Sequence, residues 1–223
     1  MPQPAQLSLP FTPASVVHDT FRDDGLRVRL WRGWLVDPTG WLRLLREATP
    51  WQQPTISVYG RQGPIPRLSC WVADPHQAYG YSGLKQPPQP WTPPLVRLRR
   101  EIEAQLALAP GHGFNGVLLN YYRDGRDAMG WHADDEPELD PESPIASLSL
   151  GASRTFRLRP RGGAGQPLDL ELADGDLLVM DPPTQSHWQH ALPRRLRLRE
   201  PRLNLTFRRL GGAVVARQRG SLL

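Results

Sequence analysis

Apolar residues recur at helical spacing in two segments of the first half of the chain. Residues 41–48 (WLRLLREA) carry a short pattern of this kind and residues 95–108 (LVRLRREIEAQLAL) a longer one. A repeat of three to four residues places these side chains on one face of a helix. We therefore predict helices over 41–48 and 95–108, with short strands near 56–59 and 69–72.

From residue 116 onward the pattern changes to short apolar segments separated by turn residues such as Asp124-Gly125 and Gly162-Gly163. These segments predict strands at 117–122, 145–150, 155–159, 168–172, 177–180 and 203–209. Many short strands that follow a helix are typical of a double-sheet fold. We predict an α+β chain that is mainly β: a double-stranded β-helix, or cupin-like jelly roll, with supporting helices.

The chain is 223 residues long, which suits a single domain with one sizeable core. Residues 1–20 are rich in proline and aperiodic, so they predict a loose arm, and residues 211–223 predict a tail. The domain itself is expected over 21–210, with its jelly-roll core over 116–210. Residues 54–94 stand apart within it because they combine many proline, glycine and aromatic residues.

Charge and cysteine content narrow the setting of the protein. The formal net charge is +5 and the pI about 10, which suits a nucleic-acid partner, although arginine-rich composition from a GC-rich codon bias is an alternative reason. There is no apolar run of membrane-spanning length and no signal-peptide pattern. The single cysteine, Cys70, fits a reducing compartment and is expected to be a small buried apolar side chain. We expect a cytoplasmic monomer without a membrane partner.

A candidate metal site begins at His132 and Asp134, which are two positions apart. On an extended segment such side chains point to the same face, so one ion can bind both. A later histidine would complete a two-histidine, one-carboxylate face, which is the signature of non-haem iron(II) oxygenases. His187 and His190 compete for this position. We favour His190, because it precedes an arginine-bearing strand, and expect His187 to be a hydrogen-bonded loop histidine.

That strand, at residues 202–208, alternates strictly between polar and apolar side chains. Arg202, Asn204, Thr206 and Arg208 occupy one face, and leucine and phenylalanine the other. The polar face would be exposed to solvent in an ordinary surface strand. Directly after a candidate ligand it predicts a pocket instead, because forked guanidinium groups match the carboxylates of a dicarboxylic acid. Asn120 and Tyr122 share one parity on their own strand and are expected to face the same pocket.

Several of these segments together resemble the DNA-repair branch of the AlkB-type oxidative demethylases. The resemblance covers about residues 54–210 and is carried by NYYRDG at 120–125, WHADDE at 131–136, SPIASLSLGASRTF at 143–156, HWQHALP at 187–193 and PRLNLTFR at 201–208. It implies that His132, Asp134 and His190 bind Fe(2+). It also implies that 2-oxoglutarate binds to Asn120, Tyr122, Arg202, Thr206 and Arg208, with Arg208 at the distal carboxylate and Arg202 near the metal-bound end.

The resemblance further implies that the single domain is catalytic and that residues 54–94 form a nucleotide-recognition lid. The residues implied in contact with DNA are Val58, Tyr59 and Gly60 as a wedge, Arg67, Tyr79 and Tyr81 in the lid, and Asp135 and Glu136 at the polar edge of the base. Without the resemblance, these aromatic side chains would more simply pin loops onto the core. An enzyme that acts on a base must first extrude it from the duplex, and stacking on aromatic rings offsets part of that cost.

The implied reaction is oxidative demethylation of 1-methyladenine and 3-methylcytosine in alkylated DNA, with release of formaldehyde and formation of succinate. Three alternatives stay open at this point. The chain could be a 2-oxoglutarate oxygenase that acts on RNA, a catalytically silent cupin that binds nucleic acid, or a zinc hydrolase. The intact triad and both strand arginines argue against the silent protein. The absence of a His-Glu motif argues against the hydrolase.

Overall fold

Two antiparallel sheets form the framework of the protein in the computed structural model, which describes residues 18–58, 61–75, 77, 79–81, 84–163 and 165–211. The larger sheet has seven strands, in the spatial order β1 (Asp19–Asp23), β2 (Leu26–Trp31), β13 (Leu177–Met180), β10 (Ile145–Gly151), β15 (Arg202–Arg208), β8 (Gly116–Tyr122) and β5 (Leu68–Ala73). The smaller sheet has four, in the order β12 (Leu168–Leu172), β11 (Arg154–Pro160), β14 (Trp188–Leu192) and β9 (Met129–His132).

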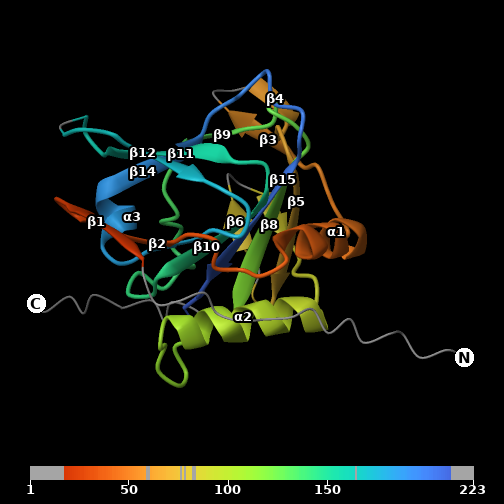
Figure 1. Cartoon of the computed structure of the whole chain (residues 1–223), viewed down its shortest axis with the longest axis horizontal. Helices are drawn as coiled ribbons and strands as arrows, with labels where there is room; N and C mark the ends of the chain where they lie inside the picture. Colours follow the sequence, from red (N-terminus) through yellow and green to blue (C-terminus); the bar gives the residue numbers. More distant parts are fainter. Residues whose placement is uncertain are drawn as a thin grey trace, which may run out of the picture.

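Two hairpins and three helices complete the described part of the fold. The hairpins are β3 (Thr55–Val58) with β4 (Arg61–Pro64), and β6 (Tyr79–Tyr81) with β7 (Leu84–Gln86). The helices are α1 (Pro38–Ala48), α2 (Pro93–Gln105) and the single turn α3 (Thr184–His187). Figure 1 shows α1 and α2 outside the seven-stranded sheet, on the side away from the four-stranded sheet. This arrangement confirms the predicted mainly β jelly roll with supporting helices.

Strands β10, β15 and β8 of the seven-stranded sheet are buried on both faces. Strand β15 shows how the sequence distinguishes the two faces. Its odd-numbered residues Leu203, Leu205 and Phe207 belong to the core that packs against α1 and α2. Its even-numbered residues are polar and face the other sheet. A second core, with residues from β2, β13, β11 and β12, joins the two sheets beside this polar region. The inner face therefore leaves an opening in the apolar packing that is lined by polar side chains.

The two long helices form where the local sequence supplies both a start and a buried face. Asp37 caps α1 by accepting a hydrogen bond from the backbone N–H of Gly40, and proline follows at the first helical position. Trp41 and Leu45, four residues apart, are the buried side chains of this helix. Helix α2 also starts with proline and buries Leu95, Leu98 and Ile102. The predicted helices thus exist, each beginning two or three residues earlier than the apolar pattern indicates.

Several strands are missing from the sequence-based prediction. Strands β1 and β2 precede α1, and β1 starts at Asp19, two residues before the predicted start of the domain. Strand β1 lies at the edge of its sheet and exposes most of its side chains, so it lacks the apolar alternation of a half-buried strand. The sequence led us to expect an extended segment where β9 lies and a loop where β14 lies. The arm up to residue 17 and the tail from residue 212 lie outside the described residues.

Cys70 lies on β5 inside the core beneath the helices and is 3% exposed, which confirms its predicted burial. Burial raises the pKa of its thiol to about 11, so almost no thiolate is present at neutral pH. We expect the native protein to react with an aromatic disulfide reagent at least about 100 times more slowly than the guanidinium-unfolded protein. Absorbance of the released thiolate measures both rates. A fast reaction in the native state would contradict this burial.

Among the helices that the structure describes, none is long and apolar enough to cross a membrane.

Candidate metal centre and cosubstrate cavity

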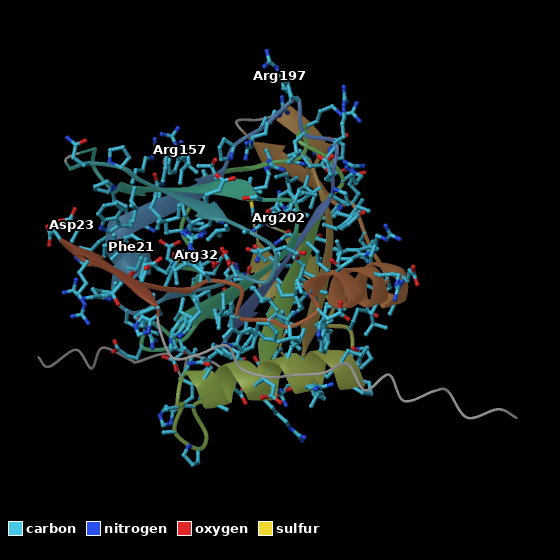
Figure 2. The ribbon with its side chains drawn as sticks, viewed as in Figure 1. Phe21, Asp23, Arg32, Arg157, Arg197 and Arg202 are labelled. Carbon is cyan, nitrogen blue, oxygen red and sulfur yellow. The ribbon has the colours of Figure 1, made fainter. Side chains whose placement is uncertain are left out.

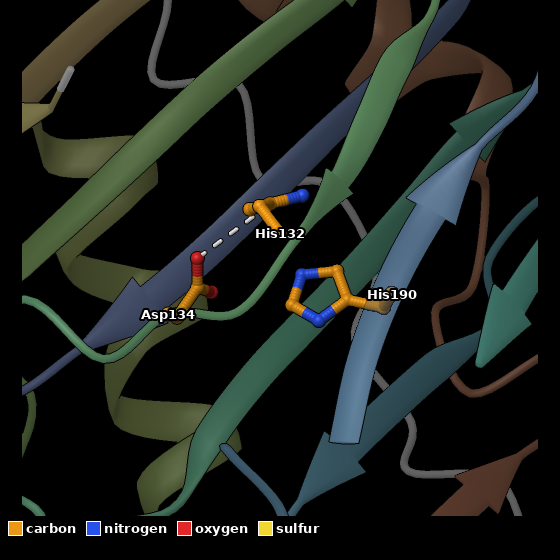
Figure 3. A group of neighbouring side chains, drawn as sticks. All are labelled: His132, Asp134 and His190. Atoms are coloured by element: carbon orange, nitrogen blue, oxygen red, sulfur yellow. Dashed lines mark ion pairs between the residues drawn. The ribbon is translucent and has the colours of Figure 1, made fainter. Parts of the chain in front are cut away.

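Two histidines that are far apart in the sequence face each other on neighbouring strands. Strand β9 ends at His132, strand β14 carries His190, and the antiparallel pairing makes the two residues direct register partners. Their ring centroids are 4.2 Å apart. Figure 3 shows both rings on the same side of the sheet, together with the carboxylate of Asp134. Strand pairing alone therefore brings two of the three predicted ligands together.

Asp134 completes the group from a position just beyond the end of β9. Its Oδ1 lies 3.7 Å from Nε2 of His132, and the candidate ligand atoms of all three residues lie within 4.8 Å of one another. The structure thus assembles the predicted triad but corrects the reason given for it. Because β9 ends at His132, Asp134 is not a same-face neighbour on a strand, and a bend in the following segment places its carboxylate.

The structure also separates the two histidines that competed for the third position. His190 is buried beside His132, whereas His187 is exposed at the end of α3. The Nδ1 of His187 lies 3.2 Å from the carbonyl oxygen of Pro183. His187 is therefore the hydrogen-bonded histidine that the sequence led us to expect, and it lies outside the triad.

The local electrostatics keep all three side chains in the protonation state that a metal requires. Burial lowers the pKa of His132, and burial with the neighbouring His132 lowers the pKa of His190 to about 3, so both rings are neutral at pH 7. Burial alone would raise the pKa of Asp134, but the positive Arg208, together with the two histidines once they are protonated in acid, outweighs it and lowers this pKa to about 2. The Nδ1 of His132 lies 2.9 Å from the carbonyl oxygen of Gly130, which leaves Nε2 for a metal.

Polar side chains from the seven-stranded sheet line a cavity that opens onto the triad. The five residues predicted to hold the cosubstrate all line it: Asn120 and Tyr122 on β8, and Arg202, Thr206 and Arg208 on β15. Ser147 and Asn204 line it too and are joined by a 2.9 Å hydrogen bond. The alternation of β15 predicted Asn204 on the pocket face, although it was not among the residues implied to bind 2-oxoglutarate, and Ser147 was not predicted at all. The same rule applied to β10 would have found Ser147.

The two arginines occupy opposite ends of the cavity, in the reverse of the predicted order. A terminal nitrogen of Arg208 lies 2.7 Å from Oδ1 of Asp134, so Arg208 is at the metal end. Arg202, six residues earlier on the same strand, donates to the hydroxyl of Ser149 at 2.9 Å and lies beside the ring of Tyr122. The prediction that Arg208 meets the distal carboxylate, with Arg202 near the metal, is therefore corrected: this geometry supports Arg202 for the distal carboxylate.

The surroundings of Arg202 test whether a dicarboxylic acid fits the cavity. Arg202 is 1% exposed, and no carboxylate of the described residues forms an ion pair with it. Its Nε has no hydrogen-bond partner within this part of the chain, and burial lowers its pKa to about 10. Figure 2 shows Arg202 inside the molecule, whereas Arg157 and Arg197 lie at its periphery. A buried cation without a protein anion fits an anionic cosubstrate.

The residues predicted to contact a base are only partly described. The side chain of Arg67 is buried and donates from Nε to the amide oxygen of Asn120 at 2.8 Å, which connects it to the cosubstrate cavity. Asp135 and Glu136 line a second cavity that shares Asp134 and Arg208 with the first. Asp135 is paired with Arg161 at 2.5 Å. Tyr59 and Gly60 lie outside the described residues, and only the backbone of Val58, Tyr79 and Tyr81 is described.

A comparison with known families accounts for this arrangement. The family model described as "2OG-Fe(II) oxygenase superfamily" matches residues 33–208, which include both sheets, the triad and the polar cavity. The chain belongs to this superfamily. Membership implies Fe(2+) as cofactor and 2-oxoglutarate as cosubstrate, as predicted, and the donor set of two imidazoles and one carboxylate fits iron(II).

Relatives of this superfamily member confirm the resemblance to AlkB-type proteins. The DNA oxidative demethylase ALKBH2 of Mus musculus is 43% identical over 162 residues, which cover 70% of this chain and 66% of the relative. ALKBH2 of Homo sapiens is 42% identical, with 70% and 60% covered. The alpha-ketoglutarate-dependent dioxygenase alkB homolog 3 of Homo sapiens is 39% identical, with 82% and 65% covered. The matched part of the chain thus spans about two thirds or less of these relatives.

A solved structure supports the fold independently. The structure of OsALKBH1 superposes with a TM-score of 0.58 over 86% of this chain and 100% of the other, at 20% identity. At that identity the likeness establishes the shared fold alone.

Proposed function

We propose that this oxygenase demethylates N-alkylated bases in DNA, with 1-methyladenine and 3-methylcytosine as substrates. The proposal rests on the relatives named as DNA oxidative demethylases together with the assembled triad. The observation that favours an active oxygenase over a catalytically silent protein is the buried Arg202. A silent nucleic-acid binder has no need of a buried cation at the far end of a cavity that begins at a metal triad. The cytoplasmic location and monomeric state stay predictions.

The residues of the chain have separate tasks in this proposal. His132, Asp134 and His190 would hold Fe(2+). When bound there, the iron supplies the activation of dioxygen, coupled to the oxidation of 2-oxoglutarate. Arg202 binds the distal carboxylate of 2-oxoglutarate by charge-assisted hydrogen bonds. Arg208 fixes the carboxylate of Asp134 at the metal end of the cavity.

Further tasks fall to the residues around the base. A base must leave the duplex to reach a buried metal, and a methylated base that pairs badly costs least to extrude. We propose that Asp135 and Glu136 face the polar edge of this base, because they line the cavity that adjoins Asp134. The resemblance to AlkB-type demethylases supports further contacts with DNA, which we also propose. They involve Val58, Tyr59, Gly60, Arg67, Tyr79 and Tyr81.

The test supplies Fe(2+), 2-oxoglutarate and an oligonucleotide that carries one 1-methyladenine. We expect succinate to form and the oligonucleotide to lose the mass of one CH2 unit. An unmethylated oligonucleotide is the substrate control, and a matched methylated RNA tests the RNA alternative. Succinate without loss of the methyl group from either nucleic acid would overturn the DNA substrate while keeping the oxygenase.

Two histidine variants provide a matched pair for the same assay. His190→Ala is expected to reduce methyl loss to background, because it removes a metal ligand. His187→Ala makes the same change three residues away on an exposed side chain and is expected to keep native turnover. Equal loss in both variants, or in neither, would contradict the assignment of His190.

A further inference from the structure

The main-chain N–H of Asp134 is held by a side chain from a distant part of the sequence. Strand β9 ends at His132, so the strand ladder does not fix the residues that follow. The N–H of Asp134 instead donates to the side-chain oxygen Oε1 of Gln185 at 2.9 Å. This bond fixes the backbone from which the triad carboxylate projects.

Gln185 lies in the single helical turn α3, which is firmly anchored. The neighbouring Thr184 is 1% exposed. The hydroxyl of Thr184 accepts a hydrogen bond from the backbone N–H of Arg27 and donates one to the carbonyl oxygen of Arg27. At the start of the turn, Asp181 accepts two hydrogen bonds from the guanidinium of Arg29, at 2.8 and 2.6 Å. The turn is thus tied to strand β2 at two points, which gives Gln185 a rigid base.

The other end of the same amide restrains its orientation. Nε2 of Gln185 lies 3.2 Å from the sulfur of Met180, a residue that lines both the cosubstrate cavity and the adjoining cavity. With the nitrogen turned to Met180, the oxygen faces Asp134. The same turn continues directly into β14, which carries His190. Gln185 therefore links the segment that holds one triad residue to the segment that leads to another.

We propose that Gln185 is a positioning residue that sets the distance between the carboxylate of Asp134 and the two histidines before the metal binds. The inference rests on the proposed metal site. Removing the acceptor takes away the hydrogen bond that holds the backbone of Asp134, while Arg208 still contacts its carboxylate. Part of the ordering of the carboxylate must then be completed when the metal binds. Partners that orient metal ligands typically change metal affinity about 10- to 100-fold when they are lost.

The test measures metal affinity, without turnover, by titrating the metal-free protein with Mn2+, which suits the same nitrogen and oxygen donors. Gln185→Met keeps the length of the side chain but has no acceptor oxygen. We expect its Kd for Mn2+ to rise at least about 10-fold, while the Tm of the metal-free protein stays within a few degrees of native. A purely structural role would lower Tm and leave the Mn2+ affinity of the folded protein unchanged.

Gln189→Met is the matched control, because Gln189 lies on β14 and its side-chain oxygen accepts from Arg159 instead. It is expected to bind Mn2+ like the native protein. If Gln185→Met does not fold, Gln185→Asn, whose shorter amide does not reach Asp134, is expected to show the same loss of affinity. Native affinity in the folded Gln185 variant, or an equal loss in Gln189→Met, overturns the proposal. Failure of the metal site itself is a separate result, in which the native protein and His132→Ala bind Mn2+ equally.

Discussion

Asp134→Asn is expected to weaken Mn2+ binding more than about 100-fold and to destabilise the metal-free protein by about 3 kcal/mol. The first effect follows because an amide replaces the only negative ligand of the triad. The second follows because Arg208 is 3% exposed and its guanidinium lies 2.7 Å from the same carboxylate. Removing one partner of a buried ion pair takes away the charge that compensates the other buried charge. Titration with Mn2+ and urea unfolding measure the two effects separately.

The pH dependence of that stability loss has a definite sign. The folded protein lowers the pKa of Asp134 from 3.8 to about 2, so the ion pair stabilises the folded state fully above about pH 4. As the pH falls toward 2, the unfolded chain binds the proton first and the contribution is lost. The difference in unfolding free energy between the native protein and Asp134→Asn should therefore shrink below pH 4. A difference that grows on acidification would contradict the pairing with Arg208.

Asp127→Asn is a matched control for this variant. Asp127 is also a buried aspartate, 5% exposed, and it accepts two hydrogen bonds from the guanidinium of Arg123. We expect this variant to lose stability but to bind Mn2+ with native affinity, because it lies outside the triad. Weakened Mn2+ binding in Asp127→Asn would show that general loosening of the fold, rather than a missing ligand, explains the result for Asp134.

The sequence correctly predicts those site residues whose position depends only on the polar and apolar pattern of a single strand. The alternation of β15 places Arg202, Thr206 and Arg208 on one face, and burial of the other face by α1 and α2 forces this choice. Asn120 and Tyr122 follow by the same rule on β8. The pairing of His132 with His190 depends instead on a strand, β14, whose partners β11 and β9 are far away in the sequence. Its short segment contains too little periodicity to indicate a strand by itself.

The sequence could not predict which of Arg202 and Arg208 lies nearer the metal, because this depends on where the segment after Asp134 meets the seven-stranded sheet. That segment runs beside the end of β15: Leu139 forms a β-bridge with Leu210, and the backbone N–H of Asp140 donates to the carbonyl oxygen of Arg209. These contacts bring Asp134 to the end of the strand that carries Arg208. A local pattern fixes which face a residue occupies, whereas only the tertiary contacts fix which end of the strand lies near the metal.

Arg202→Met is expected to raise the KM for 2-oxoglutarate by about 100-fold or more and to leave the Kd for Mn2+ unchanged. Loss of one partner from a buried, hydrogen-bonded charge pair costs about 2–5 kcal/mol, and each 1.4 kcal/mol is a factor of ten in affinity. Arg157→Met makes the same change on the four-stranded sheet, where native Arg157 forms an ion pair with the exposed Asp169. This variant is expected to keep the native KM.

A second keto acid identifies which end of the cosubstrate Arg202 meets. 2-Oxopentanoate has the chain length and keto acid end of 2-oxoglutarate but lacks the distal carboxylate, so native protein should strongly prefer 2-oxoglutarate. In Arg202→Met this preference should disappear, because methionine gains nothing from the missing charge. If Arg208→Met abolishes the preference instead and keeps native Mn2+ affinity, the order of the two arginines inferred from the Asp134–Arg208 contact is wrong. Retention of the preference for 2-oxoglutarate in Arg208→Met is the result that this contact predicts.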